Sequence, residues 1–379
     1  MARSFKKKSL VVSKARIVSF AGIALCLVLV YVIGFTDIRS VQYDRADAQA
    51  KTAATTTAAV AAPAAPVLDK AAYDKKMLQL ANYPVAKVAS STATSTASTT
   101  VVKAVVHPWP VKAAYPLAGA LLPFNRIVAY YGNFYSTAMG ILGQDPPAVM
   151  IPKLQAAVAE WKAADPSTPV IPAIDYIAIT AQGSPGADGK YRFRMPDSQI
   201  QEAISLANQV HGIVILDLQV GLSTVQTEVP LLDKYLALPN VHLALDPEFA
   251  MHNGAKPGTV VGSLDATDIN WAANHLAAIV QANNLTPKIL VVHRFTQAMV
   301  THAENIKPLP EVQVVMDMDG WGSPAKKIGT YTQVIDPEPV QFTGFKLFYK
   351  NDLKAPSTRM MTPAEVLKLI PQPSFIQYQ

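Results

Sequence analysis

The sequence predicts a (β/α)8 barrel, in which eight parallel strands close into a ring and helices cover its outside. Eight short apolar runs recur between residues 126 and 379, and segments of helical period separate several of them. Runs that are apolar on both faces are typical of parallel strands covered by helices. At least three of the runs end in carboxylates, and the roughly 250 residues involved match the usual size of such a barrel.

The expected elements alternate along this part of the chain. Strands are expected at residues 126–132, 170–179, 212–218, 241–249, 288–295, 312–319, 342–350 and 374–379, and helices at residues 149–164, 198–210, 267–283 and 362–370. Thr267 stands before an acidic first turn and Thr362 is followed by Pro363 and Glu365, so both threonines are candidate N-caps. The alternative is an open doubly wound sheet, but no glycine-rich phosphate loop follows the first strand.

The sequence reaches residue 379 within the eighth expected strand, so the position of a helix after that strand needs cover from elsewhere. Residues 68–83 carry leucine, tyrosine and methionine at helical spacing. They form either a helix that packs on the barrel or a transient helix inside a linker, since short helices alone are marginal. We expect this segment or residues 113–124 to cover the vacant position.

The amino-terminal part differs in composition. Residues 1–16 form a basic tail, and residues 17–35 are uncharged and mostly apolar over about the length that crosses a bilayer as a helix. Because a basic flank stays cytoplasmic, we expect a single-pass anchor in the cell membrane with the rest of the chain on the outer side. The alternative is a cleaved signal peptide, whose apolar core is usually shorter. Cys26 is the only cysteine, so an internal disulfide is excluded.

Residues 36–123 are rich in alanine, threonine, serine and proline, a composition that buries little and is typical of a tether. The expected organisation is therefore a cytoplasmic tail, a transmembrane anchor, a linker and an extracytoplasmic barrel. Their bounds are 1–16, 17–35, 36–123 with the short helix at 68–83, and 124–379.

The net charge of +6 gives no support to a nucleic-acid partner. Six of the 33 basic residues lie in the tail, which contains no acid, and this leaves 27 basic against 27 acidic residues in the remainder. No P-loop, G-x-S-x-G or H-E-x-x-H sequence occurs, which argues against nucleotide, serine-hydrolase or zincin chemistry. We expect no cofactor, no nucleotide and no bound metal.

Carboxylates stand at the carboxyl ends of the expected strands, which form the functional face of such barrels. They are Asp217, Asp246, Glu248, Asp317 and Asp319. Acids are costly beside a core unless they hydrate, pair or act on something. Because side chains alternate along a strand, Asp317 and Asp319 point the same way, and so do Asp217 and Gln219.

Asp246 and Glu248 also share a face if their strand persists past Pro247. We expect Glu248 to be the proton donor, because a carboxyl that is partly screened from water and close to other acids has a raised pKa. Asp246 has a plainer alternative as a buried acceptor that fixes the turn. One of Asp317 and Asp319 has a plainer alternative as a loop cap.

Further candidates for substrate binding lie at or near the ends of the strands. They are Tyr131, Asp175, Tyr176, Gln219, His293, Trp321, Lys346 and Tyr349. Together with Phe134, their aromatic rings suit sugars, because carboxylates supply acid and base while flat apolar faces stack on carbohydrate. His293 has alternatives as a metal ligand or a satisfied barrel histidine. Lys346 is expected to pair with one of the acids.

The segments VILDLQVG, LALDPEF, DMDGWGS and FIQYQ resemble an uncharacterised family of exported bacterial proteins with a glycoside-hydrolase-like TIM barrel. The resemblance covers residues 124–379 and none of the tether. It implies fold and export but no substrate. The sequence departs from the commonest retaining sugar hydrolases, because the loop after the seventh strand offers Asp352 and no glutamate.

Three functional hypotheses follow. The first is a membrane-anchored glycoside hydrolase acting on cell-envelope or capsular polysaccharide, with Glu248 as general acid, Asp317 or Asp319 as base or nucleophile, and Asp217 and Asp246 tuning them. The second is a non-catalytic barrel that binds cell-wall glycan. The third is a divalent-metal hydrolase that uses Asp217, Asp246, His293 and Asp317.

Overall fold

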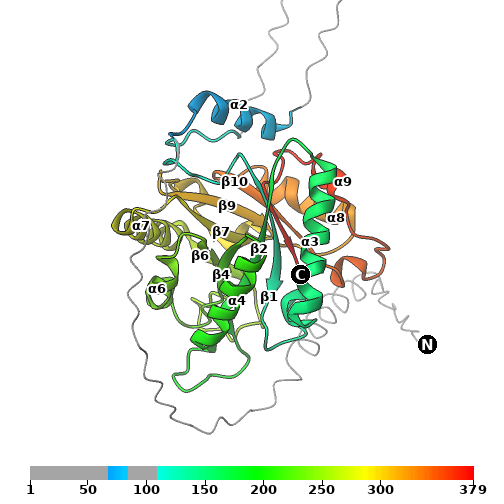
Figure 1. Ribbon diagram of the computed structural model, residues 1–379. Helices are drawn as coiled ribbons and strands as arrows, with labels where there is room; N and C mark the ends of the chain where they lie inside the picture. Colours follow the sequence, from blue (N-terminus) through cyan, green and yellow to red (C-terminus); the bar gives the residue numbers. More distant parts are fainter. Residues whose placement is uncertain (1–66, 84–108) are drawn as a thin grey trace, which may run out of the picture. The chain divides into compact units, whose positions relative to one another are not determined.

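The computed structural model describes residues 67–83 and 109–379. Figure 1 shows a ring of strands with helices around it. The ring consists of β1 (Arg126–Gly132), β2 (Val170–Ala181), β4 (Ile213–Leu218), β5 (Val241–Leu245), β7 (Lys288–Arg294), β9 (Val312–Met318), β10 (Phe342–Leu347) and β11 (Phe375–Tyr378). All neighbours pair in parallel, and β1 pairs with both β2 and β11, which closes the ring. The predicted (β/α)8 barrel is confirmed.

Helices occupy the connections between strands, as the alternation predicts. The helices are α3 (Pro147–Ala164), α4 (Asp197–Gln209), α5 (Val225–Glu228), α6 (Asp233–Leu236), α7 (Ala266–Asn283), α8 (Pro324–Thr330) and α9 (Pro363–Val366). Single turns of other helix types are η1 (Ile141–Gly143), η2 (Val229–Leu232), η3 (Pro247–Phe249), η4 (Gln297–Met299), η5 (Ala303–Asn305), η6 (Tyr331–Ile335) and η7 (Asn351–Leu353). The short strand β3 (Arg192–Arg194) pairs antiparallel with β2, and β6 (Leu264–Asp265) pairs with β8 (Val300–Thr301).

Several expected boundaries were wrong, each for a local reason. The fourth strand of the ring ends at Leu245 instead of residue 249, because Asp246 caps the turn η3 by accepting a hydrogen bond from the backbone N–H of Glu248 at 3.1 Å. The seventh strand ends at Leu347 instead of residue 350. The helix expected at 362–370 is the single turn α9.

The two expected N-caps had different outcomes. Thr362 caps α9 in a capping box with Glu365, as predicted. Thr267 was the wrong choice for α7, because the cap is Asp265, two residues earlier. The Asp265 side chain accepts from the N–H of Thr267, and Asp268 completes the capping box.

The barrel interior is filled in layers by alternate residues of each strand. The layer nearest the amino ends contains Ile127, Ile171, Ile213, His242, Ile289, Gln313 and Phe342, and the layer above it contains Ala129, Ala173, Ile215, Ala244, Val291, Val315, Gly344 and Phe375. The intervening strand residues point outward and pack against the helices. The small residues of the second layer leave room above them for long polar side chains at the carboxyl end.

The helix α2 (Lys70–Ala81) closes the amino end of the barrel. Its buried side chains Tyr73, Met77 and Leu80 join the same apolar cluster as the first interior layer. The Leu80 carbonyl accepts from the N–H of Gln372, just before β11, and the Asn82 side chain donates to carbonyls of the segment that follows α9. The helix therefore lies under the strands and does not take the position of a helix after β11.

Residues 109–124 contribute to the same base. Trp109 is buried and donates its indole N–H to the Gln341 carbonyl at 2.8 Å, just before β10. Leu122 is buried as well, and its backbone exchanges two hydrogen bonds with the side chain of Gln313 at the start of β9. This part of the stretch expected as linker is packed against the domain.

No helix among the described residues has the length and apolar character needed to span a membrane. The predicted anchor at 17–35 lies outside the described residues, as do the basic tail 1–16 and most of the predicted linker. These assignments stay predictions.

Candidate functional site

Polar side chains meet inside the barrel at the carboxyl ends of the strands. Because interior positions alternate, each strand of the ring supplies one side chain, which lies at or next to the strand end in every case except Asp175, six residues before the end of β2. These residues are Tyr131, Asp175, Asp217, Asp246, His293, Asp317, Lys346 and Gln377, and all of them are buried. All except Gln377 are candidates from the sequence, and the structure brings them together.

His293 lies among three carboxylates. Its Nε2 atom is 2.8 Å from Asp217 Oδ2, and its Nδ1 atom is 3.2 Å from Asp317 Oδ2 and 3.5 Å from Asp319 Oδ2. Burial alone would lower the pKa of His293, but the hydrogen bond to Asp217 and the neighbouring acids raise it well above its usual value. We therefore describe His293 as a buried imidazolium at neutral pH.

Lys346 is the second cation of the cluster, and it pairs with an acid as expected. Its Nζ atom lies 3.1 Å from Asp319 Oδ1 and 3.7 Å from the centre of the Tyr131 ring. Burial would lower the pKa of Lys346, but Asp319 and Asp246 raise it above the usual value. The ammonium is thus held between a carboxylate and an aromatic face.

Gln219 links two of these side chains. Its amide nitrogen donates to the Tyr131 hydroxyl and to Asp246 Oδ2, both at 3.2 Å, and its amide oxygen accepts from the N–H of Ala181 at 3.1 Å. Because its oxygen is occupied by a backbone donor, the orientation of the amide is fixed. Gln219 was predicted to share the face of Asp217, and these contacts place it in the same cluster.

Asp317 is fully buried, and its carboxyl group lies against Gly344 of the neighbouring strand β10. A Cβ atom at Gly344 would come within 2.4 Å of Asp317 Oδ1, so only glycine leaves room for this carboxyl group. Burial raises the pKa of Asp317. Asp319, two residues later, reaches the end of the barrel and keeps 9% exposure.

Glu248 approaches the cluster from the turn η3 and not from a strand. It is half-buried, and its backbone carbonyl accepts from the N–H of Gly262, which holds the following loop against the turn. A side chain at Gly262 would meet the carbonyl oxygens of Pro247, Glu248 and Ala250 within 2.8 Å. Burial, with Asp246 and Asp319 nearby, raises the pKa of Glu248 to about 8.

The charges of the cluster balance only if some carboxyls are protonated. Six carboxyl groups face two cations, and a fully ionised set would leave a large uncompensated charge in a buried site. Burial raises the pKa of Asp175 well above its usual value, that of Asp246 to about 7, and those of Glu248 and Asp317 as well. The other two carboxylates, Asp217 and Asp319, are the ones in close contact with His293 and Lys346.

Some candidates from the sequence lie away from the cluster. Tyr176 follows Asp175, so it points to the opposite face of β2, where its ring stacks on Phe134 at 4.8 Å. Tyr349 hydrogen bonds with the Tyr130 hydroxyl at 3.0 Å and stacks on Tyr378. These tyrosines and Phe134 have packing roles in the outer layer.

Two contacts of the site were not foreseen. Gln377 donates to Asp175 Oδ2. Phe375 points into the barrel, so alternation along β11 would have placed Gln377, two residues later, on the same inner face. Lys327 and Asp352 form a buried ion pair at 3.0 Å, and the ammonium also donates to the carbonyls of Gly320 and Lys346. This pair therefore fixes the backbone beside both Asp319 and Lys346.

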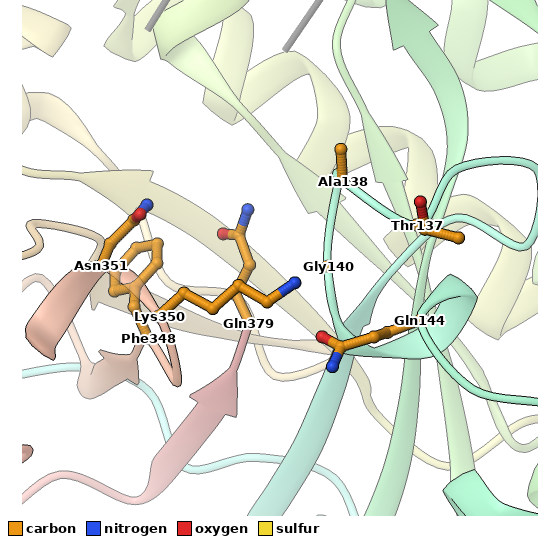
Figure 2. Close-up of a pocket in the computed structure, with 8 residues that line it drawn as sticks. All are labelled: Thr137, Ala138, Gly140, Gln144, Phe348, Lys350, Asn351 and Gln379. Atoms are coloured by element: carbon orange, nitrogen blue, oxygen red, sulfur yellow. The ribbon is translucent and has the colours of Figure 1, made fainter. Parts of the chain in front are cut away.

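A shallow pocket opens at the same end of the barrel (Figure 2). It has a volume of about 60 Å³ and is lined by Thr137, Ala138, Gly140, Gln144, Phe348, Lys350, Asn351 and Gln379. Figure 2 shows the segment after β1 on one side and the segment after β10 on the other. Phe348 also lies beneath Lys346, whose Nζ atom is 5.3 Å from its ring centre. The pocket thus borders the charged cluster.

The described parts of the chain contain no group of three or more histidine, cysteine, aspartate or glutamate side chains with the geometry to hold a metal ion. The metal-hydrolase hypothesis therefore gains no support from the arrangement of Asp217, Asp246, His293 and Asp317.

Comparisons with known proteins do not identify a family or a function for this chain. No family model and no curated protein matches the chain. Among solved structures, it is similar to HPPK-DHPS of Plasmodium falciparum with pteroate, at 11% identity and a TM-score of 0.31, over 67% of this chain and 44% of that one. It is also similar to a GH18 chitinase from Pseudoalteromonas aurantia, at 11% identity and a TM-score of 0.24, over 67% and 94%. The chain spans under half of the first neighbour, and at these TM-scores neither carries an argument.

Proposed function

We propose that this domain is a glycoside-hydrolase-like enzyme that cleaves cell-envelope or capsular polysaccharide by acid and base catalysis from carboxyl groups. The observation that carries the proposal is that two acids with different surroundings, the half-buried Glu248 and the nearly buried Asp319, lie at one barrel mouth. Glu248 has a pKa raised to about 8, while Asp319 is held by the Lys346 ammonium at 3.1 Å. Glycosidic bond cleavage requires one carboxyl group that carries a proton and a second that acts as base or nucleophile.

Each residue has a role that follows from its surroundings. Glu248 protonates the leaving oxygen, because it holds a proton at neutral pH and remains partly exposed. Asp319 acts as base or nucleophile, in preference to Asp317, whose carboxyl group is buried against Gly344. Asp217 holds the His293 imidazolium, and Asp246 raises the pKa of Glu248.

The cellular setting is part of the proposal. An uncleaved anchor at 17–35 would hold the enzyme on the outer side of the membrane, where envelope polysaccharide lies. Membrane fractionation and protease accessibility of the full chain test this directly. Recovery of the full chain in the soluble fraction after lysis would contradict anchoring, without bearing on the catalytic roles.

The test of the function is turnover by the full chain on envelope and capsule preparations, read as new reducing ends. Glu248→Gln and Asp319→Asn should each lower the rate by roughly 10²- to 10⁴-fold, the usual contribution of such groups. Glu160→Gln, a change to an exposed acid of α3, is the control and should leave the rate unchanged.

Binding measurements separate the enzyme from the alternative of a non-catalytic glycan-binding barrel. For the enzyme, the Glu248→Gln protein should still bind the glycan that the wild type cleaves. If the wild type binds the glycan but releases no reducing ends, the catalytic proposal fails and the binding barrel is favoured.

A further inference from the structure

The barrel mouth is basic on one side, beside the carboxyl cluster. Trp321 follows Asp319 after β9, and its ring is close to two ammonium groups. Lys326 Nζ is 4.6 Å and Lys354 Nζ is 5.1 Å from the ring centre. Lys350, in the loop after β10, lines the pocket of Figure 2. Three lysines are thus grouped here, with Lys326 in α8 after β9 and Lys350 and Lys354 in the segment after β10.

What sets these lysines apart is that they lie together, because other exposed lysines within residues 67–83 and 109–379, such as Lys162 on α3, also have no ion pair. Within residues 67–83 and 109–379, none of Lys326, Lys350 and Lys354 has a carboxylate partner within ion-pair distance. By contrast, Lys153 on α3 pairs with Asp145 at 2.6 Å, and Lys234 pairs with Asp197. The mouth therefore presents positive charge that the described protein does not neutralise.

The pocket and the tryptophan belong to one surface because Asp352 ties their loops together. Its carboxylate accepts from the N–H of Gly322 at 2.9 Å and from the N–H of Phe348 at 3.0 Å. The first donor follows Trp321 and the second begins the pocket-lining segment. The same carboxylate pairs with Lys327 at 3.0 Å, which fixes the position of Asp352 between the two segments.

The pocket offers hydrogen-bonding groups around its one cation. Asn351, Gln144 and Gln379 contribute amides, and the Phe348 ring provides an apolar wall. A space of about 60 Å³ is too small for a whole sugar ring but accommodates an acidic substituent of a few atoms. Lysine binds such groups as a point charge, and amides orient their oxygens.

We infer that the substrate is an acidic glycan, whose carboxylate, sulfate or phosphate group binds in the pocket at Lys350 while a neighbouring sugar lies against Trp321, close to Lys326 and Lys354. The inference rests on the proposed function, because it assigns the same mouth as the glycan site. The basic side of the mouth also attracts an anion past carboxyl groups that would otherwise repel it.

Binding measurements with the full chain carrying Glu248→Gln test the inference without turnover. The probes are oligogalacturonate, a glycerol-phosphate oligomer, a neutral xylo-oligosaccharide of equal length and single-stranded DNA of equal charge. At least one of the two acidic oligomers should bind roughly tenfold or more tightly than the neutral one and than DNA, and the tighter of the two identifies the anion.

Variants locate the binding. Lys350→Gln should weaken binding of the acidic oligomer by roughly tenfold, and Lys326→Gln and Lys354→Gln by several-fold each. Lys162→Gln, a change to an exposed lysine on α3, should have no effect. Equal binding of acidic and neutral oligomers, equal binding of DNA, or an equal loss in the Lys162→Gln protein would each overturn the inference. A wild type that binds acidic oligomers yet cleaves nothing would overturn only the proposed function.

Discussion

The raised pKa of Glu248 makes a quantitative prediction for the stability of the Glu248→Gln protein. The glutamine amide has the shape of a protonated carboxyl group but cannot ionise. Well below pH 4.5, Glu248 is protonated in both the folded and the unfolded wild type. At pH 4.5 the unfolded state is only half ionised, so the two proteins should still have nearly equal free energies of unfolding, within about 0.4 kcal/mol. Any larger difference measured there reflects packing and hydrogen bonding alone.

The difference in free energy of unfolding between the Glu248→Gln protein and the wild type should grow with pH. The folded pKa of about 8 lies above the unfolded value of 4.5, so the folded state retains a proton that the unfolded state releases. The wild type therefore loses stability between these values, by about 1.4 kcal/mol per pH unit, and the loss is complete above pH 8. The variant escapes this loss, and we expect it to be more stable than the wild type by on the order of 3 to 5 kcal/mol at pH 9.

Urea unfolding at pH 4.5, 6, 7.5 and 9, followed by tryptophan fluorescence and circular dichroism, measures this difference. The Glu160→Gln protein is the control, because its acid is exposed, and its stability should follow that of the wild type at every pH. A Glu248→Gln protein that is no more stable than the wild type at pH 9 would show that Glu248 ionises in its usual range. Its role as proton donor would then have to be abandoned.

Two further predictions concern Gly344 and the cap of α7. Gly344→Ala should lower the free energy of unfolding in urea by about 1 to 3 kcal/mol and lower turnover at least tenfold, because the new Cβ atom displaces Asp317. The control is Gly329→Ala in α8, where a Cβ atom has nothing within 4 Å, and its free energy of unfolding should change by less than about 1 kcal/mol. Asp265→Ala should lower the free energy of unfolding by about 1 to 2 kcal/mol, because α7 loses its cap, whereas Thr267→Ala should lower it by less than about 0.5 kcal/mol. If thermal or urea unfolding shows the larger loss for Thr267→Ala, Asp265 is not the cap.

The sequence predicts the ring and much of its inner cluster because strand residues alternate. Acids and a histidine at the ends of apolar runs place Asp217, His293 and Asp317 on the inner face, where the structure has them. The same alternation separates Asp175 from Tyr176, and applying it consistently would have removed the tyrosine from the candidates. Alternation works here because both faces of each strand are buried and the register is therefore fixed.

Other features depend on contacts that no local pattern encodes. Glu248 reaches the cluster through a turn that forms because the Asp246 side chain bonds to the backbone after the strand ends. Lys327 and Asp352 are 25 residues apart, and nothing in either neighbourhood marks them as a buried pair. Gly344 matters only through the side chain that occupies the space beside it.

Because α2 closes the amino end of the barrel, the point where the preceding chain joins the domain lies at the opposite end from the candidate site. Any tension arriving along the polypeptide from before residue 67 is delivered to the foot of the barrel, where the Leu80 carbonyl holds Gln372 and the buried Met77 anchors the helix. Asp319 lies at the other end, roughly 20 Å away along a seven-residue strand. If the predicted anchor at 17–35 holds the chain to a membrane, a load on the chain should therefore dislodge α2 before it distorts the opposite end of the barrel.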